Sequence, residues 1–143
     1  RLGVPEDDIS TILMADHGLA LYGNAIIVNT DFAAGNPEVV EGFLAAVAAG
    51  WQDVIDDPAA GAQMVADRNP AIDVDLEQRR LQLAIDANVL TDHVRENGMG
   101  GIDEARMATA LEQIAETYTF ETEPDAALYF DGSFLPEGNF PLE

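Results

Sequence analysis

Three Asx-Pro pairs divide the middle of the chain into helical segments: Asn36-Pro37, Asp57-Pro58 and Asn69-Pro70. An Asn or Asp side chain can accept a hydrogen bond from the first turn of a helix, and proline is tolerated at the first helical position. The same proline cannot continue a helix that arrives from upstream. The sequence therefore predicts one helix that begins after Asn36, and a second that begins after Asp57 and ends at Asn69.

The helix predicted after Asn36 carries an apolar residue at every fourth position, namely Val39, Phe43, Val47 and Trp51. This spacing places the four side chains along one face, so we expect the helix to pack against a large part of the protein. Trp51 is accordingly interpreted as a core residue rather than a ligand platform.

Two further helices and a short turn are predicted downstream. Asp73 or Asp75 can cap a helix that runs to about residue 90, and Asp103 can cap one that runs to about residue 118. The pair Asn97-Gly98 is typical of the end of a short helical turn. We interpret Arg79-Arg80 as a solvated helix face with local ion pairs to nearby carboxylates.

Two short apolar runs are predicted to be strands, residues 11–16 (TILMAD) and residues 25–29 (AIIVN). The second run is β-branched and is bounded by turn residues. Because two strands do not make a stable sheet alone, we expect strands from an upstream part of a longer protein to complete it. The expected fold class is therefore α/β, with this chain as a mostly helical portion.

Composition and charge exclude several classes of function. The chain has 27 acidic and 6 basic residues, a net charge of −21, and all its basic residues are arginines. Such a surface repels phosphate backbones and anionic lipids, so we expect no nucleic-acid partner. There is no cysteine, and His17 and His93 show no metal-ligand spacing, so we predict no metal site, no cofactor and no catalytic residue.

The candidate site is a polar and aromatic cluster that contains Asp16, His17, Tyr22 and Asn24. Adjacent residues on a strand point to opposite faces, so Asp16 and His17 are not a ready-made catalytic pair. One interpretation is a loop in which Asp16 caps a turn and His17 is exposed. The other is that a strand brings these polar groups to the rim of a small-ligand cleft.

The run ADHGLALYGNAIIVNTDFAAGNPEVVEGFLAAVAAGWQDVIDDP resembles the C-terminal half of bacterial ABC-transporter substrate-binding proteins. The nearest branch is the thiamine-pyrimidine-precursor-binding (SsuA-like) family, which is related to nitrate, sulfonate and taurine binders. The similarity continues through RRLQLAIDANVLTDHVRENGMGGID and FDGSFLP, so that it extends from about residue 11 to residue 136.

The resemblance implies a type II periplasmic-binding-protein fold, in which two α/β lobes close on a small ligand by hinge bending. It implies that the chain is a C-terminal segment with a hinge strand at about 11–16 and a lobe strand at about 25–29. Packing helices would span 37–118, and a docked tail 119–143. The same resemblance places Asp16, His17 and Tyr22 near the interlobe cleft.

The implied function is the solute-binding component of an ABC importer, which captures a small heteroaromatic such as a thiamine pyrimidine precursor. Its partners would be the permease subunits, and the protein would be monomeric and periplasmic or extracellular and membrane-anchored. The alternatives are a pyrimidine-synthase-type enzyme of the same family, a sulfonate, nitrate, taurine or flavin binder, and a helical interaction module. Eukaryotic synthases of this family use their own histidine, a pyridoxal cofactor and a cysteine-rich motif, whereas this chain has no cysteine.

Overall fold

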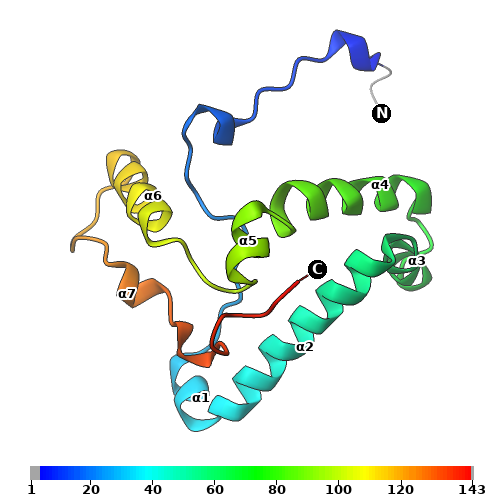
Figure 1. Ribbon diagram of the computed structural model, residues 1–143. Helices are drawn as coiled ribbons and strands as arrows, with labels where there is room; N and C mark the ends of the chain where they lie inside the picture. The colour runs from blue at the N-terminus through cyan, green and yellow to red at the C-terminus, as the bar shows by residue number, and fades with distance from the viewer. Residues whose placement is uncertain (1–3, 143) are drawn as a thin grey trace. The chain divides into compact units, whose positions relative to one another are not determined.

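The computed structural model of the protein describes residues 4–142, and Figure 1 shows its helices. The α-helices are α1 (Thr30–Gly35), α2 (Pro37–Asp56), α3 (Pro58–Arg68), α4 (Val74–Ala84), α5 (Asp92–Asn97), α6 (Glu104–Thr117) and α7 (Ala126–Tyr129). Single turns are formed by η1 (Glu6–Asp8), η2 (Met14–His17) and η4 (Gly132–Phe134), and a π-helical turn, η3 (Ile85–Val89), extends α4. The described chain is thus mostly helical, as expected.

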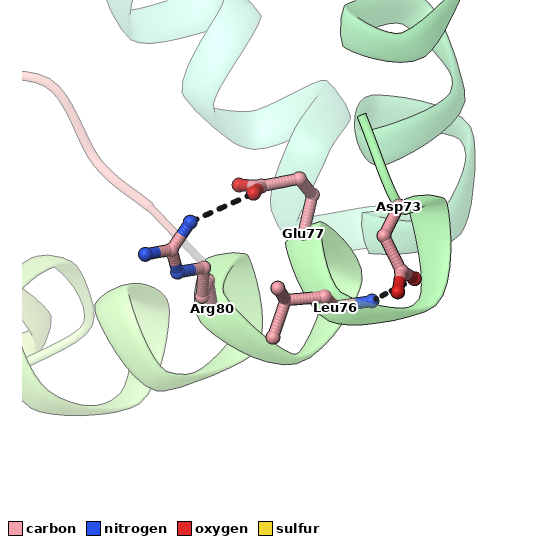
Figure 2. Close-up of polar contacts among 4 residues, drawn as sticks. All are labelled: Asp73, Leu76, Glu77 and Arg80. Atoms are coloured by element: carbon pink, nitrogen blue, oxygen red, sulfur yellow. Dashed lines mark hydrogen bonds and ion pairs between the residues drawn. The ribbon is translucent and has the colours of Figure 1, made fainter. Parts of the chain in front are cut away.

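Three helices begin at aspartates that the sequence predicted as caps. A carboxylate oxygen of Asp57 accepts a hydrogen bond at 2.9 Å from the backbone N–H three residues further along. Asp73 does the same at 3.1 Å, as Figure 2 shows, and Asp103 at 2.7 Å. Each bond satisfies a backbone donor that has no partner within its own helix, which explains why α3, α4 and α6 begin where they do.

Asn36 marks the start of α2 in a different way from the prediction. Its side chain makes no capping bond to α2. Instead, its Nδ2 donates to the carbonyl of Phe32 at 3.0 Å, and its backbone N–H donates to the same oxygen at 2.9 Å. Asn36 therefore ends α1, a helix that the sequence analysis missed, and Pro37 begins α2 through its fixed φ.

The two predicted strands do not form. Residues 14–17 make turn η2, and residues 25–29 are irregular, although Leu13 and Asn29 keep extended backbone angles. A strand exists only where its N–H and C=O groups pair with a neighbouring strand. Within residues 4–142, the β pairing is one isolated antiparallel bridge, between Met99 and Phe140, so neither run has such a neighbour.

Contacts divide the chain into two units, and each unit is built from two separate stretches. Unit 1 contains the chain up to Ile26 together with Ile102–Phe130, so it includes η1, η2, α6 and α7. Unit 2 contains Ile27–Gly101 and the chain from Asp131 onward, so it includes α1 to α5, η3 and η4. The chain therefore passes between the units three times.

Unit 2 is organised around a close approach of α2, α3 and α4. Gly61 of α3 is buried, and a Cβ at this position would lie 3.2 Å from the Leu81 side chain and 3.3 Å from that of Val54. The missing side chain lets the helices pack at this point. On the exposed side of α4, Arg80 forms the predicted local ion pair with Glu77 at 2.8 Å (Figure 2).

The end of the tail packs against the turn that follows α5, also within unit 2. The backbone N–H of Met99 donates to the carbonyl of Phe140 at 2.7 Å, and that of Phe140 donates back at 3.0 Å. Asn139 Nδ2 donates to the carbonyl of Asn97 at 2.8 Å, and Leu142 is buried. Residue 143 of the predicted docked tail lies outside the described residues.

Candidate functional site

Asp16 and His17 are the last two residues of turn η2. Gly18 closes the turn with a φ of +91°, and its N–H donates to the carbonyl of Ala15 at 3.2 Å. This left-handed conformation favours glycine. Both site side chains are exposed, and successive side chains on such a turn point about 120° apart, so the two still do not face each other.

Tyr22 lies at the N-terminal end of α6. Its hydroxyl oxygen accepts a hydrogen bond from the backbone N–H of Asp103 at 2.8 Å and lies 3.4 Å from the carbonyl of the same residue. The guanidinium of Arg106 sits 4.4 Å from the centre of the Tyr22 ring. The phenol is therefore held by α6 through both its hydroxyl and its π face.

Two further side chains of α6 bind the backbone between η2 and Tyr22. Gln113 accepts from the N–H of Ala20 at 3.0 Å and donates to the carbonyl of Gly18 at 2.7 Å. Arg106 donates from Nε to the carbonyl of Ala20 at 3.0 Å and from Nη2 to that of Leu21 at 2.8 Å. These side chains satisfy backbone groups that a neighbouring strand would satisfy in a sheet.

The structure thus brings Tyr22 to α6 and leaves the other predicted site residues on exposed backbone. Asn24 lies in the irregular segment that follows Tyr22, and its side chain is exposed. Within residues 4–142, no hydrogen bond joins Asp16, His17, Tyr22 or Asn24 to one another. Their use as one ligand site stays a prediction.

Sequence reasoning missed Arg106 and Gln113 as residues of this region. They lie seven positions apart, two turns of an α-helix, so they share one face of α6. The presence of two long polar side chains on one helix face was the sequence signal that could have indicated a polar contact surface on α6. Nothing local in the sequence indicates that this face meets backbone 85 to 95 residues away.

The surface of unit 2 also has a shallow open hollow of about 230 Å³. Its lining residues are Val47, Gly50, Trp51, Val54, Gly61, Val65 and Leu81. Trp51 is half-buried there, which agrees only in part with its interpretation as a core residue. The hollow lacks the convergent polar groups that orient a small ligand, so it is a seam between packed helices.

The described residues, 4–142, show neither a metal-binding cluster nor a membrane-spanning helix. In that part of the chain, His, Asp and Glu side chains nowhere gather in a group of three that could hold a metal ion. None of the helices described has the length and apolarity to cross a bilayer.

One family model matches part of the chain. Residues 3–61 match the family model described as NMT1/THI5 like, which confirms the resemblance for that region and suggests a periplasmic-binding-type or related function. The matched range contains Asp16, His17, Tyr22 and Asn24, whereas α6 lies outside it. No curated protein and no solved structure matches the chain.

Proposed function

We propose that the chain is part of the solute-binding component of an ABC importer, and that it contributes to a cleft for a small heteroaromatic such as a thiamine pyrimidine precursor. The observation that carries the proposal is the NMT1/THI5-like match over residues 3–61, because this range contains all four candidate ligand residues. The proposed setting is outside the inner membrane, with the permease subunits as partners and a monomeric binding protein.

The exposed side chains offer the chemistry that a flat nitrogen heterocycle needs. The Asp16 carboxylate accepts hydrogen bonds, so it suits an exocyclic amino group. The Asn24 amide both donates and accepts, and the His17 imidazole does one or the other at each ring nitrogen. Because α6 already engages the Tyr22 hydroxyl, Tyr22 would contribute its ring rather than a free hydroxyl.

The charges near the candidate site favour a neutral or cationic solute over nitrate or a sulfonate. Arg106 is the cation beside Tyr22, and its Nε and Nη2 already donate to backbone carbonyls. Asp16 lies nearby in the sequence and adds negative charge. An anion would therefore gain little binding energy here, whereas the amino group of an aminopyrimidine can donate a hydrogen bond to the Asp16 carboxylate.

A thermal-shift screen of the full-length protein tests the proposal. The probes are a hydroxymethyl-aminopyrimidine, thiamine, taurine, nitrate and a flavin, each at millimolar concentration. A ligand at about 100 times its Kd stabilises the native state by roughly 2.7 kcal/mol, so the aminopyrimidine is expected to raise the Tm by several degrees. Asp16→Asn should reduce this shift, and Asp53→Asn, an exposed position in α2, should not. The absence of a shift with every probe would refute the proposal.

The pyrimidine-synthase alternative is tested with pyridoxal phosphate. That cofactor acts through a covalent bond to a lysine amine, and the 143 residues contain no lysine. The residues of this chain therefore do not fit the cofactor. A new absorbance band on adding pyridoxal phosphate to the full-length protein would favour the enzyme over the binder.

A further inference from the structure

We propose that Arg106 and Gln113 of α6 are positioning residues for solute binding. They fix the backbone of Gly18–Tyr22 and thereby set the position of η2, which carries Asp16 and His17. The inference rests on the proposed function, because it assumes that Asp16 and His17 contact the solute.

Gln113 bonds the first half of the Gly18–Tyr22 segment through both the oxygen and the nitrogen of its side-chain amide. Its Oε1 accepts from the N–H of Ala20 at 3.0 Å while its Nε2 donates to the carbonyl of Gly18 at 2.7 Å. A single side chain therefore fixes one donor and one acceptor two residues apart. Two directional hydrogen bonds constrain the position of the backbone more than a single one would.

Arg106 holds the second half. It donates to the carbonyls of Ala20 and Leu21 at 3.0 and 2.8 Å, and its guanidinium covers the Tyr22 ring at 4.4 Å. Hydrogen bonds from a charged donor are stronger than neutral ones. Together with Gln113, Arg106 makes contact with four of the five residues of the segment.

Gly18 links the contacts from α6 to η2. Gly18 follows His17 directly and closes the turn with its left-handed φ of +91°, and its carbonyl is the acceptor for Gln113. Burial cannot fix the turn, because no residue of η2 is buried. The polar contacts from α6 therefore supply the constraint that packing supplies elsewhere.

Helix α6, which carries both positioning residues, lies outside the region that matches the family model. The match ends at residue 61, whereas Arg106 and Gln113 follow 45 or more residues later (106 − 61 = 45). The side chains proposed to touch the solute lie within the match, and the side chains that place them lie beyond it. Changes in α6 should then alter solute binding without any contact to the solute.

Three substitutions separate this role from a general loss of structure. Gln113→Leu removes both amide contacts, and Gln113→Glu keeps an acceptor for the Ala20 N–H while it removes the donor to Gly18. Thr109→Ala is the matched control, because the Thr109 hydroxyl donates only within α6, to the carbonyl of Ala105 at 3.1 Å. Circular dichroism of each variant of the full-length protein checks that the helices are retained.

The first measurement needs no solute. Amide hydrogen exchange at Ala20 should become about 2- to 10-fold faster in Gln113→Leu, which corresponds to the loss of one hydrogen bond. Gln113→Glu should restore most of the protection at Ala20, and Thr109→Ala should leave it unchanged. The NMR signal of the His17 ring should shift in Gln113→Leu and not in Thr109→Ala. Unchanged exchange at Ala20 in Gln113→Leu would overturn the inference.

The second measurement is calorimetric titration with hydroxymethyl-aminopyrimidine. We expect Gln113→Leu to weaken binding by about 2- to 10-fold, in proportion to its effect on exchange, with no change in Thr109→Ala. If the wild-type protein binds the aminopyrimidine and Gln113→Leu binds it with the same affinity, the positioning role is refuted and the proposed function is not. A wild-type protein that binds no probe would refute the proposed function, and the inference with it.

Discussion

Replacing Tyr22 by phenylalanine removes one hydroxyl and leaves the ring beneath the Arg106 guanidinium, so this variant isolates the hydrogen bond from the Asp103 backbone. That bond is 2.8 Å long, and the Tyr22 residue is 38% exposed. Intramolecular hydrogen bonds contribute about 0.5–1.5 kcal/mol net, and partial exposure favours the lower half of the range. We therefore expect Tyr22→Phe to lower the free energy of unfolding by about 0.5–1 kcal/mol.

Tyr22→Leu also removes the aromatic face under the Arg106 guanidinium, which lies 4.4 Å from the ring centre. A cation–π contact at an exposed site is worth about 0.5–1 kcal/mol. A double-mutant cycle of Tyr22→Leu with Arg106→Met should therefore give a coupling energy of this size. Methionine is chosen because it keeps an unbranched apolar stem.

Urea unfolding followed by far-UV circular dichroism measures these differences. With a denaturant slope of about 1–3 kcal/mol per molar urea, Tyr22→Phe should lower the midpoint by roughly 0.2–1 M. Effects of substitutions at independent sites add to within about 0.3–0.5 kcal/mol, so a larger coupling energy reports a direct interaction. An unchanged midpoint in Tyr22→Phe, together with a coupling energy indistinguishable from zero, would show that α6 does not hold Tyr22 as described.

Three other outcomes are expected elsewhere in the chain. Asp57→Ala should destabilise the protein by about 1 kcal/mol in urea unfolding through loss of the α3 cap, and Asp57→Asn much less. Gly98→Ala should lower the free energy of unfolding by about 2 kcal/mol, because φ is +78° and the new Cβ would lie 2.5 Å from a backbone oxygen. Gly42→Ala, in open space within α2, should instead raise it by about 0.5–1 kcal/mol. A larger loss of stability in Gly42→Ala than in Gly98→Ala would contradict both expectations. Hydrogen bonds from the side chain and backbone of Ser133 hold the pKa of the Asp131 carboxyl below its ordinary value. They therefore stabilise the folded turn above the ordinary aspartate pKa, and this contribution is lost as the pH falls through the lowered pKa. The amide signal of residue 133 should report the titration midpoint of Asp131, and Ser133→Ala should raise that midpoint.

Helix boundaries could be predicted from the sequence because their signals are local. Asp57 accepts from the N–H three residues away, and Pro58 next to it has a fixed φ, so a few residues decide the start of α3. Asn36 shows the limit of this reasoning. Its side chain has the right chemistry for a cap but serves the end of α1, a helix of six residues that is too short to show an apolar period.

The strands and the organisation of the site could not be predicted in this way. Ile26, Ile27 and Val28 have strong strand propensity, but such propensity reflects packing on neighbouring strands, which the described chain does not supply. The polar and aromatic types of the site residues could be read from the sequence. The residues that position them, however, lie far along the chain. Arg106 and Gln113 reach back across 85 to 95 positions, a separation that no short pattern encodes.

The division of unit 1 into two stretches has a consequence for synthesis. Gln113 lies 95 residues after Gly18, and ribosomes add about 5–20 residues per second. The Gly18–Tyr22 segment therefore leaves the ribosome about 5–20 s before the helix that holds it exists. A nascent chain arrested just before α6 would already contain α2, α3 and α4, while the candidate site still lacked its shape. The contacts that α6 makes with the Gly18–Tyr22 segment can form only after α1 to α5 have been synthesised.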